Sequence, residues 1–594
     1  MARGLGVDSS EHPAAELRHE SKAAVGAVAS PGQTSCVHHD DRILVGWVGC
    51  IDWTRSPRRD HAREHGDGRT IASAYADVGP ALLDELGGDV ALALFDRDRD
   101  ELLLAVDRVG VRTLTYCTTQ WGVAFASNAR ALGAHPDAAR DIDPQSVFDF
   151  VYFHMVPSPK SIFRGWRKLL PGECVIVRGH DLEHRRYWTP RYVDDAPASQ
   201  ADLAQEYRQT VRHAVQSCLD TSHGRIGAFL SGGTDSSTVA GLVGELTGEP
   251  ANTYSIGFDV PGYDESDYAQ IAVRHFGTHH HEYTVTPDDV FEAAPRLARE
   301  YDEPFGNASA VASLYCAELA KNDGIATLFG GDGGDEIFAG NERYAKQKIF
   351  EHYYRIPEPL RRMLLEPLVE VLPGNRFPIG KAKSYVRQAR APLPERLESY
   401  NFLNRIPPSE IFAPEFLETV HTSEPLTLLR ERYDEAPSDS VLHRLLYLDL
   451  KFTLADNDLR KVSRTCEMAG VDVRYPFLDP GLIDFANRVP PGLKLKGQKL
   501  RYFFKLASEG FLPQEILTKP KHGFGVPCGR WMRDYPPLRE LAYDSLASLS
   551  RRGYLSGAFI ERLKKLHQGE HGDYYGVMVW VLTMLELWHQ HHVD

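Results

Sequence analysis

The alternation of apolar and polar positions divides this chain of 594 residues into two parts of different construction. In the first part, from 23 to about 187, short apolar runs are separated by turns that carry Asp and Gly, as at 42–48, 90–95, 101–106 and 174–178. Helical spacing interrupts these runs at about 70–86 and 144–154. The pattern predicts a strand-rich α+β domain.

In the second part, short apolar strands alternate with amphipathic helices. A polar, proline-containing linker at 194–200 leads into a predicted helix over 200–219, and strands are predicted at 226–230, 253–258 and 327–329. This alternation predicts a parallel sheet with helices on both faces, in which ligands bind at the carboxyl ends of the strands. From about 341 the chain is predicted to be almost wholly helical, and its last apolar segment, 577–588, is predicted to be a buried helix.

Charge, cysteine usage and hydropathy narrow the class of protein. The net charge of −15 argues against a nucleic-acid partner, and no apolar run is long enough for a signal peptide or a membrane span. The eight cysteines form no C-x-x-C pair, so we expect neither a zinc site nor a disulfide framework. Cysteines without such a framework are typical of a reducing compartment, so we expect a cytoplasmic location. Residues 1–21 are small and polar and are expected to form a flexible tail. The oligomeric state stays open, with a homodimer among the options.

A glycine-rich motif, Ser231-Gly-Gly-Thr-Asp-Ser-Ser237, follows the strand at 226–230 and precedes helical spacing over 237–246. Such a loop points backbone N–H groups outward at a positive helix end, which creates an anion site. Its serine hydroxyls add donors, and Asp235 is suited to hold a divalent ion against phosphate oxygens. No Lys-Ser or Lys-Thr follows the glycines, so the motif is not a Walker loop. An ordinary strand-to-helix turn is the alternative.

A second motif, Gly330-Gly-Asp-Gly-Gly-Asp-Glu336, follows the strand at 327–329. Glycines at a strand end indicate close backbone approach or positive φ. Asp332, Asp335 and Glu336 would repel one another in an apolar setting unless a bound cation or a basic partner offset their charge. We therefore predict Mg²⁺ on ATP, shared between Asp235 and Asp335. A solvent-exposed acidic turn is the alternative.

The two motifs together resemble those of the glutamine-hydrolysing asparagine synthetase family. Further segments match in the same order, and the likeness runs from about residue 70 to the C-terminus: Tyr254-Ser-Ile-Gly-Phe258, Asp264-Glu-Ser266, Gly277-Thr-His-His-His-Glu282, Asp302-Glu-Pro-Phe305, Arg474-Tyr-Pro-Phe-Leu-Asp479 and Lys519-Pro-Lys-His-Gly-Phe-Gly-Val-Pro527. The resemblance implies an Ntn-hydrolase-like α+β sandwich of the class II glutamine amidotransferase type over 22–193. It also implies an α/β synthetase domain of the ATP-pyrophosphatase type, related to adenine nucleotide α-hydrolases, with a large helical extension over 200–594.

The resemblance also implies the chemistry. A substrate carboxylate, from aspartate or a similar small molecule, is adenylated by ATP, and ammonia or an amine then attacks it, releasing AMP and pyrophosphate. Asp332 and Lys521 fall at positions that act on the reacting groups, and Asp458 and Lys461 at positions that bind the carboxylate substrate. A helix-surface ion pair is the alternative for the last two, and a surface lysine for Lys521. The ATP-binding residues implied are Leu230, Ser231, Gly232, Gly233, Asp235, Ser236, Ser237, Ile256 and Gly331.

The sequence departs from this family in its first domain. The family's glutaminase nucleophile is a cysteine directly after the initiator Met, whose free α-amine acts as base; residue 2 here is Ala, and the best match to the family's opening puts Lys22 at the position of that cysteine. The glutamine-binding Asn-Gly-Glu stretch appears as Val48-Gly-Cys-Ile-Asp52, although Asp67 is retained. Cys36 and Cys50 are internal. We therefore expect a retained fold without glutamine hydrolysis.

Three functions stay open at this point. The first is an amide ligase that uses ammonia or an amine. The second is a specialised cyclase or peptide-modifying ligase, as in the related β-lactam synthetases and lasso-peptide cyclases; the Tyr of the β-lactam-forming enzymes is replaced by Asp332, which counts against a β-lactam product. The third is a non-catalytic scaffold, against which the retained acidic residues argue. Thr234 stands where the family often has Leu, and the sequence assigns it no role.

Overall fold

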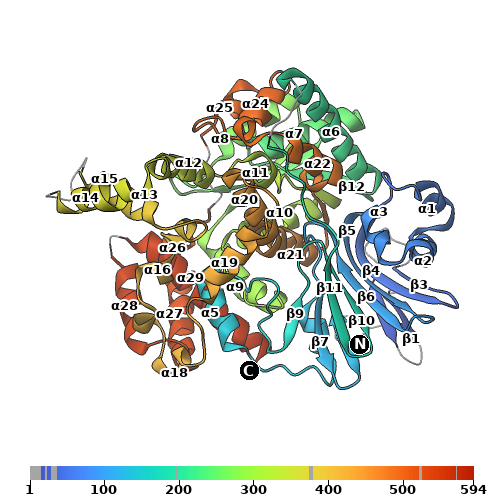
Figure 1. The fold of residues 1–594 in the computed structure, drawn as a ribbon, viewed down its shortest axis with the longest axis horizontal. Coiled ribbons are helices and arrows are strands. Elements are labelled where there is room, and N and C mark those ends of the chain that lie inside the picture. Colours follow the sequence, from blue (N-terminus) through green and yellow to red (C-terminus); the bar gives the residue numbers. More distant parts are fainter. Residues whose placement is uncertain are drawn as a thin grey trace.

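The protein consists of an N-terminal domain built on β-sheets and a larger C-terminal domain in which helices surround a parallel sheet (Figure 1). The computed structural model describes residues 15–19, 23–28, 36–194, 199–372, 379–520, 525–569 and 571–594.

The N-terminal domain contains two sheets that face each other. The larger one is antiparallel, in the order β11 (Asp181–Arg186), β10 (Glu173–Arg178), β6 (Glu101–Val106), β5 (Gly87–Asp96), β4 (Ile43–Asp52) and β3 (Val37–His39). The smaller has the order β8 (Gly122–Ala126), β7 (Thr115–Thr119) and β9 (Trp166–Lys168). Alternate residues such as Leu104 of β6 and Tyr116 of β7 share one buried cluster, which confirms the predicted α+β sandwich.

Helices cover the other face of the larger sheet, where Tyr75 and Leu82 pack in a cluster with Trp47 of β4. The single helix predicted over 70–86 is in fact two, α2 (Asp67–Val78) and α3 (Leu82–Glu85). Gly79 has φ +61° and Pro80 lacks an N–H donor, so one regular helix does not continue through them. The other predicted helix is α5 (Pro144–Phe153), capped by Asp143. α1 (Arg59–His65) and α4 (Ala129–Leu132) complete the set.

Part of the segment that was predicted to be a flexible tail, 1–21, is a strand in the structure. Residues 15–19 form strand β1 (Ala15–His19), which pairs antiparallel with β2 (Ala24–Val28). Cross-strand backbone hydrogen bonds order a segment that its polar composition alone does not mark as a strand. Lys22, predicted to stand at the position of the family's cysteine, lies outside the described residues.

The C-terminal domain is organised around a parallel sheet of order β14 (His279–Val285), β13 (Asn252–Phe258), β12 (Arg225–Phe229), β15 (Ile325–Phe329) and β16 (Asp472–Arg474). The chain proceeds from β12 outward to β14 and then returns to the other side of β12 with β15. Strand order therefore reverses between β12 and β15, and the crevice at such a point is where open α/β sheets bind ligands. Helix α6 (Gln200–Asp220) precedes β12, and the helices between the strands from β12 to β15 are α7 (Thr234–Thr247), α8 (Ser266–Phe276), α9 (Pro287–Glu300) and α10 (Ser309–Asn322).

After β15 the described chain is helical except for β16, as predicted. α29 (Gly572–His592) is buried and contains the fully buried Trp588, and no helix of the described ranges is long and apolar enough to cross a membrane. The other longer helices are α12 (Glu342–Tyr354), α15 (Ile379–Arg390), α19 (Glu424–Asp434), α20 (Val441–Leu448), α21 (Leu459–Ala469), α22 (Pro480–Arg488), α26 (Cys528–Asp534), α27 (Pro536–Ser550) and α28 (Gly557–His567); the shorter ones include α11 (Gly334–Phe338), α24 (Tyr502–Ala507) and α25 (Gln514–Thr518).

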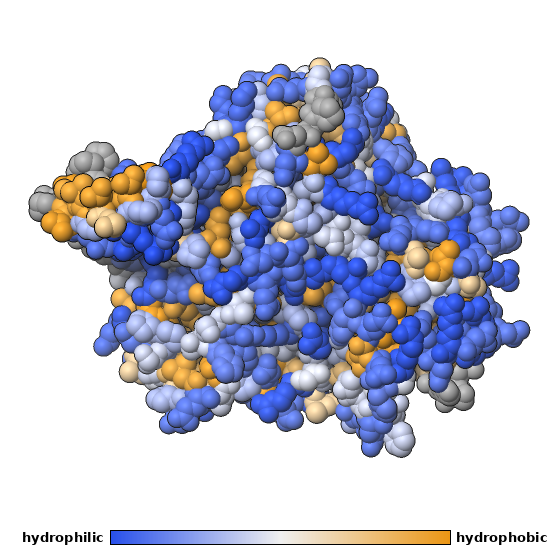
Figure 2. Space-filling model, in the orientation of Figure 1, coloured by the Kyte–Doolittle hydropathy of each residue, from blue (hydrophilic) through white to orange (hydrophobic). Residues whose placement is uncertain are grey.

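One helical arm projects from the body of the molecule. It contains α13 (Glu358–Leu360), a π-helical segment (Arg361–Leu365), α14 (Glu366–Val371) and α15, at the left of Figure 1. Figure 2 shows a hydrophobic surface along this arm, to which Met363, Leu364, Leu368 and Val371 contribute, all more than half exposed.

Candidate active site

The two glycine-rich motifs meet at the reversal point of the parallel sheet. The first follows β12 and opens α7, and the second follows β15 and opens α11. A Cβ atom on Gly331 would lie 2.9 Å from the backbone nitrogen of Ser236, and one on Gly334 would lie 2.5 Å from the Asp235 carboxyl carbon. Glycine is therefore required at both positions for the loops to approach each other.

The first loop is shaped as an anion site. Gly232 has φ +65°, and a side chain there would collide with the backbone of Tyr268. Gly233 begins α7 with no side-chain cap, which leaves N–H groups at the N-terminus of α7 directed to the crevice. The hydroxyls of Ser231 and Ser236 lie 3.1 Å apart beside these groups. The loop thus offers several donors to one anionic ligand.

The second loop contributes a carboxyl with an altered pKa. Burial raises the pKa of Asp332 to about 6, although the nearby Lys461 lowers it. Lys461 donates to Asp458 at 3.3 Å, and although burial alone would lower the pKa of its ammonium, Asp458 and Asp332 hold that pKa above its ordinary value. Burial and the charge of Asp335 raise the pKa of Glu336 well above its ordinary value. This side of the crevice therefore combines one ammonium with a carboxyl that can exchange a proton near neutral pH.

Asp458 and Lys461 are brought into the crevice by an irregular helix. A π-helical segment, η5 (Asp449–Asp458), precedes α21, and such segments often occur at functional sites. The two residues form the i,i+3 ion pair that was the alternative for them, but the pair lines the crevice rather than an outer surface.

Arg501 is a site residue that the sequence did not indicate. Its Nη1 donates to Asp235 Oδ1 at 2.6 Å and its Nη2 to Asp235 Oδ2 at 2.5 Å. The same Nη2 also pairs with Asp335, and Nη1 donates to the hydroxyl of Thr234. The guanidinium therefore lies between the two carboxylates that were predicted to share Mg²⁺.

The crevice is a cavity of about 1090 Å³. Most predicted site residues line it: Leu230, Ser231, Gly233, Asp235, Ser236, Ile256, Gly331, Asp332, Asp335, Asp458 and Lys461. Gly232 and Ser237 do not; Ser237 is fully buried within α7, so the prediction that it contacts ATP directly is not supported by its position. Lys521 lies outside the described residues, but Lys519, two positions before it, lines the cavity and pairs with Glu265 at 3.1 Å. Lining residues that the sequence did not indicate include Thr234, Glu265, Lys499, Arg501, Lys505 and Lys519.

The donor set fits a magnesium ion that also binds phosphate. Asp235 and Asp335 converge on a single guanidinium nitrogen, so one cation can contact both carboxylates. In the part of the chain that the structure describes, no three His, Cys, Asp or Glu side chains are grouped for a metal ion. Two carboxylates supplemented by phosphate oxygens and water are a common coordination of Mg²⁺.

Family models identify both domains. The model described as "Asparagine synthase" matches residues 206–590, and that described as "Glutamine amidotransferase domain" matches residues 54–188. The chain belongs to the asparagine synthase family. It is accordingly an ATP-dependent carbon–nitrogen ligase.

Individual relatives are similar in sequence to this protein over most of its length. A putative glutamine-hydrolysing asparagine synthetase of Mycobacterium tuberculosis H37Rv is 29% identical over 549 residues, covering 89% of this chain and 80% of that protein. Asparagine synthetase 1 of Bacillus subtilis 168 is 24% identical over 535 residues, covering 89% and 81%. The amidase chyE of Penicillium rubens is 25% identical over 506 residues, covering 78% and 73%. A glutamine phosphoribosylpyrophosphate amidotransferase structure from B. subtilis covers 52% of this chain and 67% of its own at 12% identity, with a TM-score of 0.20, too low to establish a shared fold.

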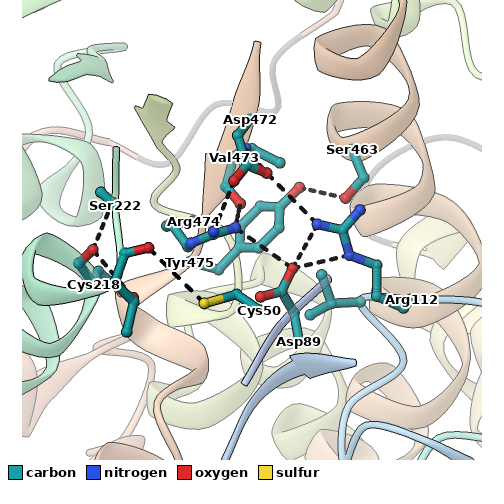
Figure 3. A network of polar contacts seen from close by, with 12 residues as sticks. Cys50, Asp89, Arg112, Cys218, Ser222, Ser463, Asp472, Val473, Arg474 and Tyr475 are labelled. Carbon is teal, nitrogen blue, oxygen red and sulfur yellow. Dashed lines mark hydrogen bonds and ion pairs between the residues drawn. The ribbon is translucent and has the colours of Figure 1, made fainter. Parts of the chain in front are cut away.

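A buried ionic network joins the two domains of this asparagine synthase family member (Figure 3). Arg112 pairs with Asp89 at 2.7 Å within the N-terminal domain, and Arg474 pairs with Asp472 at 2.7 Å in the C-terminal domain. The pairs are cross-linked, because Arg112 lies 3.6 Å from Asp472 and Arg474 lies 3.7 Å from Asp89. Arg474 also accepts a hydrogen bond at its backbone oxygen from Gly330, the start of the second loop. The interface is thereby connected to the active-site crevice.

The family segment Asp302-Glu-Pro-Phe305 serves the same interface. Glu303 pairs with Lys168 of β9 at 2.6 Å, and both side chains are only 6% exposed. Asp302 accepts a hydrogen bond from the backbone N–H of Ala129 and pairs with Arg460 of α21. These two acids therefore connect the N-terminal domain to α21, which carries Lys461.

The residues predicted to stand at the family's glutamine-binding positions contact other side chains of the protein. Asp52 accepts a hydrogen bond from Ser217 of α6 at 2.7 Å, so it contacts the C-terminal domain. Asp67, the retained position, accepts from the indole of Trp53 at 2.9 Å. Burial raises the pKa of the Cys50 thiol to about 11, which keeps it protonated at neutral pH.

Proposed function

We propose that this protein is an amide-bond-forming ligase that adenylates a substrate carboxylate, from aspartate or an aspartate-like small molecule, and transfers ammonia or an amine to it, releasing AMP and pyrophosphate. The observation that carries the proposal is the meeting of an anion loop, two convergent carboxylates and an ammonium in one cavity. The strand order of the sheet, with its reversal at this cavity, supports the ATP-pyrophosphatase type of fold for the domain.

The residues of the two loops would bind ATP, hold the metal ion and transfer a proton. The N–H groups and hydroxyls between Ser231 and Ser236 bind the pyrophosphate end of ATP. Asp235 and Asp335 would hold Mg²⁺, which when bound neutralises charge on the leaving pyrophosphate. Asp332 accepts a proton from the incoming amine, a role suited to a carboxyl whose pKa is about 6.

The side of the cavity that contains Asp332 also binds the carboxylate substrate. The Lys461 ammonium attracts its carboxylate, and Asp458 attracts a neighbouring ammonium group, such as the α-amine of an aspartate-like molecule. Lys521 follows Lys519 by two positions, and we assign it to charge that develops at the reacting phosphate and acyl carbon.

We propose further that the N-terminal domain does not hydrolyse glutamine. The strand that resembles the family's opening, β2, is preceded by β1, which pairs with it, so its first residues are not a free amino terminus in this chain. Asp52 and Asp67 are held by Ser217 and Trp53 instead of facing a ligand together. Release of glutamate from glutamine by the purified protein would contradict this proposal.

Exchange of labelled pyrophosphate into ATP tests the adenylation step. We expect exchange that depends on an added carboxylate in the wild type, and its loss in Asp235→Asn. A panel of carboxylates identifies the substrate. Carboxylate-independent background in every case would sink the proposal and favour a non-catalytic scaffold.

A specialised ligase with an amine acceptor is a second candidate. The described cysteines include no exposed thiol that could release ammonia from glutamine, which favours an acceptor other than ammonia made by this chain. A product screen by mass spectrometry, with ammonium and a panel of amines, separates the two candidates. Products formed only with ammonium would eliminate the second.

A further inference from the structure

The Arg501 guanidinium occupies the space between the carboxylates of Asp235 and Asp335. Both oxygens of Asp235 accept hydrogen bonds from it, at 2.6 and 2.5 Å, and Asp335 shares the same Nη2. The Arg501 residue is only 5% exposed, so these contacts are made away from bulk water. The two carboxylates are therefore neutralised by a cation of the chain itself.

Local structure holds Arg501 in this place. Its backbone has φ +52°, an uncommon conformation for a residue with a side chain, and its N–H donates to the carbonyl of Ala339 at 3.2 Å. A Cβ on Gly340 would collide with the Asp335 carboxylate and the guanidinium, so a glycine is needed beside the pair. The Thr234 hydroxyl accepts from Nη1. This contact gives a role to the residue that the sequence left without one.

We propose that Arg501 is the resident counter-ion of the metal site and that a divalent cation must displace it. This inference rests on the proposed function, because it takes Asp235 and Asp335 as the metal ligands. Mg²⁺ contacts its oxygen ligands at about 2.0–2.1 Å and demands near-octahedral geometry. Each oxygen of Asp235 accepts a hydrogen bond from the guanidinium, whose positive charge would repel a divalent ion bound to the same carboxylates. Metal binding therefore requires Arg501 to move away from them.

Displacement by metal alone leaves the guanidinium buried without its carboxylate partners, which is unfavourable. A phosphate or pyrophosphate group in the adjacent Ser231–Ser236 loop gives it a new anionic partner in the same cavity. The metal and the pyrophosphate group of the nucleotide should consequently bind with positive coupling, each raising the affinity for the other by the same factor. The Arg501–Thr234 pair thus prevents the site from retaining a divalent ion when no nucleotide is present.

Mn²⁺ binding followed by electron paramagnetic resonance tests the inference without any enzymatic turnover. The wild type should bind Mn²⁺ weakly alone and more tightly with inorganic pyrophosphate. Arg501→Gln should bind Mn²⁺ alone about tenfold more tightly or better, the size typical of coupled sites, and should lose most of the coupling to pyrophosphate. Asp235→Asn added to Arg501→Gln should abolish the gain, which places the bound ion at this site.

A second variant guards against failure of Arg501→Gln to fold. Thr234→Val keeps the guanidinium and both carboxylates but removes one acceptor, so Mn²⁺ affinity should rise in the same direction by about threefold. Thermal unfolding gives a further measurement: Arg501→Gln should be less stable than the wild type without metal and should be rescued by Mg²⁺, which leaves the wild type little changed. Unaltered or weaker Mn²⁺ binding in Thr234→Val and in any folded Arg501→Gln protein would overturn the inference.

The inference and the proposed function fail separately. If no carboxylate supports pyrophosphate exchange but the variants bind Mn²⁺ more tightly, the adenylation proposal is wrong and the displacement of Arg501 by a divalent cation is still supported. If exchange is observed and Mn²⁺ binding does not respond to the variants, the ligase stands and Arg501 is a fixed structural partner of the two carboxylates.

Discussion

Replacing Asp332 by Asn should stabilise the protein at neutral pH while removing ligase activity. The carboxyl binds its proton more tightly in the folded protein than in the unfolded chain, because burial raises its pKa from 3.8 to about 6. The folded state therefore loses stability as the pH rises from the lower of these values through the higher one, and the full cost is present above both. An Asn side chain of nearly the same shape never ionises and avoids this cost.

The magnitude follows from the two pKa values. A pKa raised from 3.8 to about 6 corresponds to roughly 3 kcal/mol of unfolding free energy at high pH. Lys461 loses one of its acidic neighbours in the variant but keeps Asp458 at 3.3 Å, and we expect this to reduce the net gain to about 1–2 kcal/mol. Asp458→Asn is the matched control: it removes the direct partner of a buried ammonium and should destabilise the protein instead.

Differential scanning calorimetry across a pH series measures the effect. At about pH 8 Asp332→Asn should unfold at a higher temperature than the wild type, and the difference should shrink as the pH falls toward about 5, where the wild-type carboxyl takes up its proton. Pyrophosphate exchange and amide formation measured on the same samples should show that adenylation persists while amide formation is lost. If Asp332→Asn is no more stable than the wild type at high pH, or if the difference in unfolding temperature does not depend on pH, Asp332 is not a buried carboxyl with a raised pKa.

Four other experiments test the site, the interface and the burial of one cysteine. Lys168→Met should cost about 3–5 kcal/mol of stability in thermal unfolding because Glu303 is left buried without its cation, and the added change Glu303→Gln should recover part of that loss. Gly331→Ala places a methyl group 2.9 Å from the Ser236 nitrogen and should weaken nucleotide binding in calorimetric titration by about 1–3 kcal/mol, whereas Gly492→Ala, with no atom within 4 Å of the new methyl group, should not. Lys521→Met should remove roughly 3–4 kcal/mol of transition-state stabilisation in single-turnover assays; near-wild-type rates would place that lysine outside the site. Cys50 should react with iodoacetamide slowly in the folded protein, since its thiol has a pKa of about 11, and rapid labelling followed by mass spectrometry would contradict the burial of that side chain.

The glycine motifs could be placed from the sequence because their chemistry is local. Strand, glycine loop and helix follow one another within a short span at 226–246, and the predicted elements appear as β12 and α7. Convergence of the two loops followed from the rule that parallel strands bind ligands at their carboxyl ends. The sequence alone therefore suffices to predict that Asp235, Asp332 and Asp335 lie at one site.

The contacts that cross long stretches of chain could not be predicted in this way. Arg501 lies 266 positions after Asp235, and no periodicity marks an arginine at the start of a helix as a partner of that carboxylate. β16 is a strand of three residues, too short for an alternating pattern to indicate it. Asp302 and Glu303 carry a recognisable family motif, but only the structure shows that they connect two domains.

The Glu303–Lys168 contact bears on how this chain can change during evolution. Each domain supplies one charge of an ion pair that is buried while the domains are in contact. A deletion of the N-terminal domain would remove Lys168 and would expose Glu303 and the surface on which α21 is held. We therefore expect that the amidotransferase-like domain stabilises the ligase domain, whatever chemistry it performs. Halves produced by cutting between 194 and 199 should be insoluble when made separately and soluble when made together in one cell.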